Sequence, residues 1–132
     1  MRRLIVTSEE LDQLDAYDVV VVPFPFTDRD STKRRPALVL SSKTNFNAEI
    51  GHSVLAMITS SKEGRAAWPL DTPIADLAAA GLPAPSVARM KLFTLDHRLI
   101  LRRAGRLAAS DQAGVSLSLQ ALLVRDALRE QP

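Results

Sequence analysis

Three consecutive cations stand between two strongly apolar segments, and residues of this kind suit a phosphate-binding site. Lys33, Arg34 and Arg35 end a short polar loop that separates the apolar segments 19–26 and 37–40. An arginine guanidinium is permanently charged, and its planar fork of N–H donors matches the oxygens of a phosphate group. If both apolar segments are buried strands, Arg35 lies at the mouth of a small β-fold, where it can bind phosphate.

A second group of polar side chains, Thr59, Ser60 and Ser61, follows the apolar segment 53–58. If that segment is a strand, the Thr59 hydroxyl turns toward the loop that carries Arg35 and can hydrogen-bond a phosphate oxygen. Ser60 and Ser61 offer the same chemical group. Taken alone, a β-branched residue at the end of a strand is an ordinary strand residue. The assignment of Thr59 therefore needs support from elsewhere in the chain.

The elements that must position these side chains are mostly short strands. The valine run at residues 19–22 predicts a first strand, residues 17–24, that is buried on both faces, because an unbroken apolar run has no polar face. Pro23 and Pro25 cannot donate to a ladder, so this strand frays or reaches an edge near them. Further strands are predicted over residues 37–42, 53–58, 68–70, 86–94 and 99–103, with connections at 45–51 and 62–67.

Helices are expected around these strands. A capping box that starts at Thr7 predicts a helix over residues 7–16, and Gly81 is the expected stop of a short helix over residues 72–80. Ser110 is the expected N-cap of a last helix. The buried face of that helix is predicted to contain Val115, Leu119, Leu122 and Leu123. Many short strands and a terminal helix indicate a small curled antiparallel sheet with helices attached.

Composition and charge narrow the class of protein. The chain has 132 residues, enough for one domain with a modest core. Its formal net charge is only +2, so a nucleic-acid site must come from local clustering of cations. Cysteine is absent, which excludes disulfides and thiolate metal sites and fits a cytoplasmic protein. No histidine pair or acidic cluster suggests a metal, and no apolar run of about 18 residues suggests a membrane span.

The chain resembles the MazF/PemK-like toxins of type II toxin–antitoxin systems over about residues 18–125. Four stretches in the family's order carry the resemblance, and four at natural spacing are more specific than any one alone. They are DVVVVPFPFTD from Asp18, KRRPALVLS from Lys33, AMITS from Ala56, and GLPAPSVAR from Gly81 followed by LFTLD from Leu92.

The resemblance implies a mainly β, α+β fold: a small SH3-like antiparallel barrel of the CcdB/MazF type with a C-terminal helix. One domain would then fill residues 1–132, with an added N-terminal helical extension at 1–16, the barrel at 17–104 and the C-terminal helix at 110–130. Members of this family are usually homodimers. They cleave single-stranded RNA, including mRNA, without metal or cofactor, and a cognate antitoxin inhibits them.

The resemblance also places the catalytic arginine and threonine of the family at Arg35 and Thr59. The reaction would be attack of the RNA 2′-hydroxyl on the neighbouring phosphorus, leaving a 2′,3′-cyclic phosphate and a 5′-hydroxyl. Arg35 would stabilise the charge that develops on the phosphorane. Asp18 is expected to brace Arg35 or its loop. The predicted RNA-binding residues are Asp18, Phe26, Lys33, Arg34, Ser60, Ser61, Lys62 and Arg89. Further candidates are the cations Arg29 and Arg65, and Phe24, Phe46 and Trp68 for stacking on bases.

Some features depart from the family pattern. Tyr17 stands where a glycine usually precedes the first-strand aspartate, and Lys91 stands where some relatives carry an acid. The contexts of His52 and His97 give no support for a general base, so the base stays unidentified.

Two alternatives remain open: a gyrase-poisoning toxin of the CcdB type, which would act on DNA, and a non-catalytic RNA-binding barrel. The C-terminus, Leu128-Arg129-Glu130-Gln131-Pro132, lacks the Trp-Gly-Ile ending typical of gyrase poisons.

Overall fold

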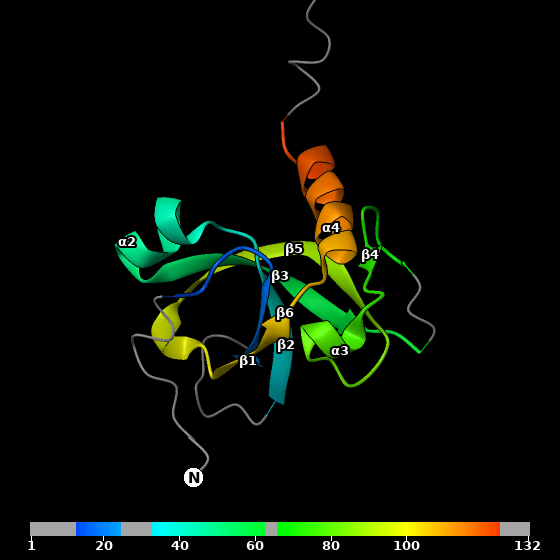
Figure 1. Ribbon diagram of the computed structural model, residues 1–132, viewed down its shortest axis with the longest axis horizontal. Helices are drawn as coiled ribbons and strands as arrows, with labels where there is room; N and C mark the ends of the chain where they lie inside the picture. Colours follow the sequence, from blue (N-terminus) through cyan, green and yellow to red (C-terminus); the bar gives the residue numbers. More distant parts are fainter. Residues whose placement is uncertain (1–12, 25–32, 63–65, 125–132) are drawn as a thin grey trace, which may run out of the picture.

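A curled six-stranded antiparallel sheet forms the centre of the protein (Figure 1). The computed structural model describes residues 13–24, 33–62 and 66–124. The strands are β1 (Asp18–Phe24), β2 (Lys33–Val39), β3 (His52–Ser60), β4 (Thr72–Pro73), β5 (Ser86–Asp96) and β6 (Arg102–Arg106), in the order β4-β5-β3-β2-β1-β6. The helical segments are η1 (Lys43–Asn47), α2 (Ala48–Ile50), α3 (Leu77–Ala80), η2 (His97–Leu99) and α4 (Ala109–Leu122). The predicted mainly β fold with a C-terminal helix is confirmed.

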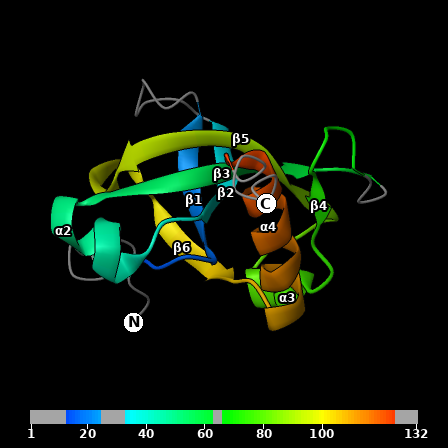
Figure 2. The same cartoon turned by 90° about the horizontal axis from the view of Figure 1, so that it is seen from above.

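Two hydrophobic cores lie on the two faces of the sheet. Val20 and Val22 of β1 belong to the first core, and Val19 belongs to the second. All three valines are fully buried, so the predicted burial of β1 on both faces is confirmed. The second core includes Ala80 of α3 and Val115 of α4, and these helices cover that side of the sheet (Figure 2). We call the two sides the first face and the second face.

Strand β2 begins four residues earlier than predicted, at Lys33. The three cations are therefore strand residues rather than the end of a loop, with Arg35 paired to Val22 of β1. Strand β3 pairs with β2 only at residues 37–39, so the β1–β2 pair extends beyond β3. Pro36 is tolerated inside β2 because no β3 partner is hydrogen-bonded there.

The central connections also differ from the predictions. The connection predicted at residues 45–51 is helical as far as Ile50, and the Ser42 side chain caps η1 by accepting from the Asn45 N–H. Residues 68–70 form a turn and not a strand, and the short strand β4 follows two residues later. The predicted helix at 72–80 is shortened to α3, although Gly81 ends it in the expected left-handed conformation, with φ of 71°.

The ends of the described chain differ as well. Residues 7–12 of the predicted N-terminal helix lie outside the described residues, and residues 13–16 form turns and irregular chain rather than helix. Strand β6 begins at Arg102 and not at Leu99, which lies in η2. Helix α4 begins after Ala108, so Ser110 is inside it and is not its N-cap.

Helix α4 buries less of its apolar face than its spacing predicts. Val115 is fully buried, but Leu122 and Leu123 are 41% and 54% exposed. The reason is geometric, because α4 extends past the sheet (Figure 1) and its last turn lies beyond Ser118, which contacts Thr72 of β4. Within the described ranges, no helix is long and apolar enough to cross a membrane.

Candidate nucleic-acid interface

The structure places Arg35 and Thr59 at equivalent positions of the adjacent strands β2 and β3, on the first face of the sheet. The last pair in the register between β2 and β3 joins Ala37 to Met57. Arg35 and Thr59 each lie two residues beyond that pair, in the direction in which the two strands separate. Side chains alternate along a strand and cross-strand partners share a face, so Arg35 and Thr59 point to the same side.

The guanidinium of Arg35 lies over the ring of Phe24, 4.9 Å from its centroid. This contact orients the planar group against β1 through cation–π attraction. The Arg35 Nε atom is buried and has no hydrogen-bond partner among the residues that the structure describes. A buried donor without an acceptor is unfavourable by about 1–3 kcal/mol, so an acceptor placed beside Arg35 would be stabilised.

A basic groove lies on the second face, where β2 and β3 separate. It consists of two adjoining pockets of about 290 Å³ and 350 Å³, which share Arg34, Pro36, Leu82 and Pro83. The first pocket is further lined by Lys33, Arg35, Ile58, Ser60, Ala84 and Ser86, and the second by Val21, Gly81, Arg102 and Ala104. The groove therefore runs beneath residues 81–84, from the end of β3 across to β6.

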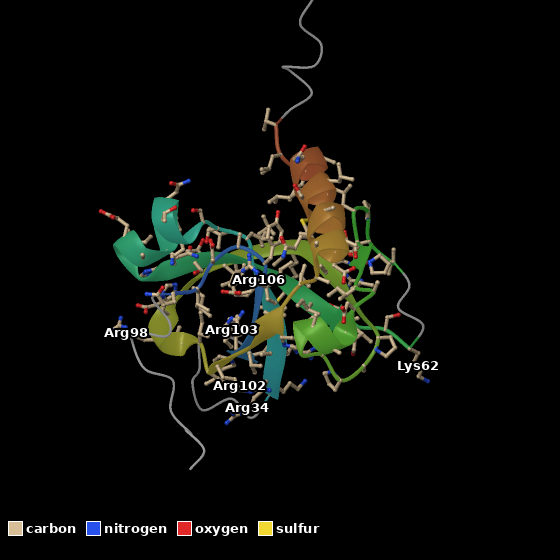
Figure 3. All side chains as sticks on the ribbon, in the orientation of Figure 1. Arg34, Lys62, Arg98, Arg102, Arg103 and Arg106 are labelled. Carbon is tan, nitrogen blue, oxygen red and sulfur yellow. The ribbon has the colours of Figure 1, made fainter. Side chains whose placement is uncertain are left out.

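Two exposed arginines dominate the charge of this groove. Arg34 comes from β2 and Arg102 from β6, and both lie at the same end of the sheet (Figure 3). Neither has an acidic partner within the described part of the chain, so their charges are available to an anionic ligand. Sequence analysis missed Arg102, whose approach to Arg34 depends on β1 lying between β2 and β6.

The sequence led us to expect that Asp18 braces Arg35, but the structure shows other partners for Asp18. Its buried carboxylate accepts hydrogen bonds from Arg103 Nη2 and Arg106 Nη1, each at 3.1 Å, and from the Asp15 N–H at 2.9 Å. Val22, the partner of Arg35, is four residues further along β1, which is about 13 Å. Asp18 therefore joins β1 to β6 and lies away from the candidate site.

Arg89 lies on β5, paired with Met57, and its guanidinium is engaged by Asp71. Arg89 Nε and Nη2 donate to the two Asp71 carboxylate oxygens at 3.1 and 2.9 Å. Burial disfavours the charged form of Asp71, but the Arg89 hydrogen bonds and the backbone N–H groups of Trp68 and Ala67 outweigh it and lower the Asp71 pKa to about 2. Arg89 is thus held by a protein partner.

The remaining predicted residues are scattered. Ser60 lines the basic groove, whereas the Ser61 N–H donates to the Pro85 carbonyl at 2.9 Å. Lys62 is exposed beyond the end of β3, apart from Arg34 and Arg102 (Figure 3). Phe26, Arg29 and Arg65 lie outside the described residues.

Both histidines lie at the far end of β3 from Thr59. His52 opens that strand, seven residues or about 23 Å from Thr59, and pairs with Asp96. His97 follows Asp96 and is buried, with its Nε2 atom 2.8 Å from the Ser53 hydroxyl. Neither imidazole can reach a phosphate held between Arg35 and Thr59.

The Tyr17 departure from the family pattern has a structural counterpart. Tyr17 has φ of 77°, in the left-handed region that favours glycine. Its N–H donates to the Val39 carbonyl at 2.7 Å, and its carbonyl accepts from Leu107 at 3.0 Å. The backbone turn is therefore kept at this position although the side chain is not glycine.

Comparisons with known proteins identify the family of this chain. Residues 15–123 match the sequence model of the family described as PemK-like, MazF-like toxin of type II toxin–antitoxin system. The chain therefore belongs to the PemK/MazF-like toxin family, as its four sequence stretches indicated. No functionally curated protein matches the chain.

Solved structures show the same fold. A MazE–MazF complex from Deinococcus radiodurans has a TM-score of 0.64 at 24% identity, covering 84% of this chain and 95% of that one. MazF from the same organism has a TM-score of 0.62 at 26% identity, covering 83% and 94%. An endoribonuclease in complex with its cognate antitoxin, from a mycobacterial species, has a TM-score of 0.63 at 13% identity, covering 90% and 98%.

Proposed function

We propose that this chain is the toxin of a type II toxin–antitoxin pair and cleaves single-stranded RNA at Arg35 and Thr59. The observation that carries the proposal is the placement of these two residues on one face, where β2 and β3 separate. Membership of the PemK/MazF-like family supports the same conclusion. So does the description of a structural neighbour as an endoribonuclease.

In the proposed reaction, the RNA 2′-hydroxyl attacks the adjacent phosphorus and the 5′-oxygen of the next nucleotide leaves. The P–O bond that forms closes a 2′,3′-cyclic phosphate, and the leaving oxygen becomes a 5′-hydroxyl. Arg35 donates to the phosphorane oxygens, and one such donor is worth about 3–4 kcal/mol of transition-state stabilisation. The Thr59 hydroxyl donates to a non-bridging oxygen and holds the attack in line. Correct alignment supplies roughly 7–11 kcal/mol in intramolecular reactions of this kind.

The basic groove supplies binding energy outside the reacting phosphate. Arg34 and Arg102 are exposed and without acidic partners among the described residues, so each can neutralise one phosphate of the strand. Lys33 and Ser60, which also line the groove, add further donors. Such contacts give affinity that decreases as salt increases.

We further propose that a cognate antitoxin inhibits the chain by laying an acidic segment over the same groove. Two of the three structural neighbours described above contain an antitoxin, named MazE in one and a cognate antitoxin in the other. Charge complementarity with Arg34 and Arg102 supports this arrangement. We also propose a homodimer, supported by the exposed apolar residues Leu117 and Leu122 of α4 and by Leu123, which follows the helix.

The first experiment is incubation of the purified protein with mixed-sequence RNA in excess EDTA, followed by mapping of the new ends. We expect discrete cuts with cyclic phosphate and 5′-hydroxyl ends, lost in Arg35→Ala and in Thr59→Val. Arg98→Ala is the matched control, because Arg98 is an exposed arginine beyond the far end of β3.

Other outcomes would contradict the proposal. RNA binding without cleavage by folded protein would favour a non-catalytic barrel. Trapping of gyrase-cleaved DNA, with RNA untouched, would favour the gyrase-poisoning alternative.

A further inference from the structure

Trp68 is an exposed aromatic side chain that is held in place by a hydrogen-bonded turn and by a contact with Arg89. It is the single tryptophan of the chain, and 46% of its surface is exposed. Large apolar side chains at the surface are common in folded proteins and need no special explanation. What distinguishes Trp68 is the turn that carries it, residues 67–71.

The Asp71 carboxylate is the centre of this turn. Its side chain is fully shielded from solvent, and one oxygen accepts from both the Ala67 and the Trp68 N–H at 2.9 Å. Arg89 donates to both carboxylate oxygens from the neighbouring strand. The turn is closed by the Asp71 N–H, which donates to the Trp68 carbonyl at 3.2 Å.

The backbone of the turn is also strained. Leu70 has φ of 68°, which is unfavourable for a residue with a branched side chain. Such conformations persist only where the surrounding contacts over-determine them, and they concentrate at functional sites. Here the surrounding contacts are those of Asp71, and the side chain that they present to solvent is the Trp68 indole.

Arg89 supports the indole from one side. Its guanidinium lies over the Trp68 ring, 4.8 Å from the centroid, and is itself fixed by the two hydrogen bonds to Asp71. The Trp68 ring therefore packs against a fixed guanidinium, and part of its surface is exposed to solvent. A planar group, such as a nucleobase, can stack on a ring presented in this way.

The position of this platform relative to Arg35 follows from the strand register. Ala37 pairs with Met57, Met57 pairs with Arg89, and the β4–β5 ladder sets Asp71 beside Arg89. Cross-strand partners share a face, so the platform continues the first face that carries Arg35 and Thr59. Arg89 is two strand spacings from β2, which is about 10 Å.

We propose that Trp68 stacks on an unpaired base of the RNA, at a nucleotide near the scissile phosphate, and so helps to select where the strand is cut. Arg89 and Asp71 are positioning residues that hold the ring. This inference rests on the proposed ribonuclease function. Stacking accepts any base but favours rings that overlap most, so the contribution is a preference at one position of the cleaved sequence.

The test uses the single tryptophan as its own probe. An oligonucleotide that contains a mapped cleavage site, with the scissile 2′-hydroxyl replaced by hydrogen, binds without being cut. We expect saturable quenching of Trp68 fluorescence, and roughly 5- to 150-fold weaker binding by Trp68→Leu. Trp68→Phe should recover much of that loss. An oligonucleotide that lacks the stacked base should bind Trp68→Leu and the unaltered protein equally.

A structural role, in which the indole only shields the Arg89–Asp71 pair, gives a different result. Trp68→Leu would then lower the unfolding temperature but leave the affinity for RNA unchanged, and fluorescence would not respond to the oligonucleotide. Those results, with cleavage by the unaltered protein intact, would overturn the inference and leave the ribonuclease function standing. Absence of both cleavage and RNA binding in the unaltered protein would instead reject the function and the inference with it.

Discussion

Replacement of Asp71 by asparagine tests whether the buried Asp71–Arg89 pair stabilises the fold. The pair is shielded, with side-chain exposures of 0% for Asp71 and 15% for Arg89. The asparagine side chain has the same shape as the aspartate but would place an N–H₂ group against Arg89 or against the Ala67 and Trp68 N–H groups. The substitution therefore leaves buried donors unpaired and removes the charge that Arg89 faces.

The magnitude follows from the pKa of Asp71. Burial acts to raise that pKa, but Arg89 and two backbone N–H groups outweigh burial and lower it from 3.8 to about 2. This difference between the ordinary and the folded-state pKa of Asp71 corresponds to about 2.4 kcal/mol of folding free energy at neutral pH. Loss of the paired charge leaves Arg89 partly desolvated, so we expect Asp71→Asn to lower the free energy of unfolding by about 2–4 kcal/mol.

The sign of the pH dependence is also determined. Because the folded-state pKa of Asp71 lies below its ordinary value, its contribution is complete above about pH 4 and is lost as the pH falls toward 2. The stability difference between the unaltered protein and Asp71→Asn should thus narrow by about 1 kcal/mol from neutral pH to about pH 3. Urea unfolding followed by circular dichroism at several pH values measures it.

A second aspartate–arginine pair provides the control. The pKa of Asp96 is also lowered to about 2, through hydrogen bonds from the side chain and backbone of Arg98. Arg98, however, is 88% exposed, so solvent screens the attraction. Asp96→Asn should therefore destabilise clearly less than Asp71→Asn. Equal losses, or a loss for Asp71→Asn that does not change with pH, would refute the reasoning from burial.

Two further predictions concern the backbone and the basic groove. Gly81→Ala should lower stability by about 2–4 kcal/mol, because a Cβ there would lie 2.2 Å from the Ala104 carbonyl oxygen at φ of 71°. Gly51→Ala, at φ of 68° with no atom within 4 Å, should lose only about 1 kcal/mol, and thermal unfolding compares the two. Arg34→Ala and Arg102→Ala should each reduce the slope of log affinity against log salt by about 0.7 for a non-cleavable RNA, and an unchanged slope would remove that residue from the interface.

The sequence predicted correctly those strands that are marked by a continuous run of apolar residues. The valine run of β1 predicted the position and the burial of that strand, because four apolar residues in a row leave no polar face for solvent. The predicted start of β2 was wrong, since a proline usually marks the edge or end of a strand. Whether Pro36 is tolerated depends on which neighbour faces its nitrogen, and that depends on where β3 stops pairing.

The candidate site was only partly predictable. Arg35 and Thr59 were identified from the family resemblance, and the strand register then placed them on the same face. The predicted partner of Asp18 was wrong because carboxylate partners are chosen in space. Its two arginines are 85 and 88 residues away in the chain, and no local pattern indicates that separation.

The sequence by itself determined the family, the main strands and the residue types available for phosphate chemistry, since these reside in local composition and order. Tertiary structure alone decided which cations have no acidic partner among the described residues and can therefore bind an anionic ligand. Arg103, Arg106 and Arg89 are engaged by aspartates, whereas Arg34 and Arg102 converge on one groove. The sequence gives the number of cations. Which of them pair with aspartates and which meet in a groove depends on the strand order and register, because these bring distant residues side by side.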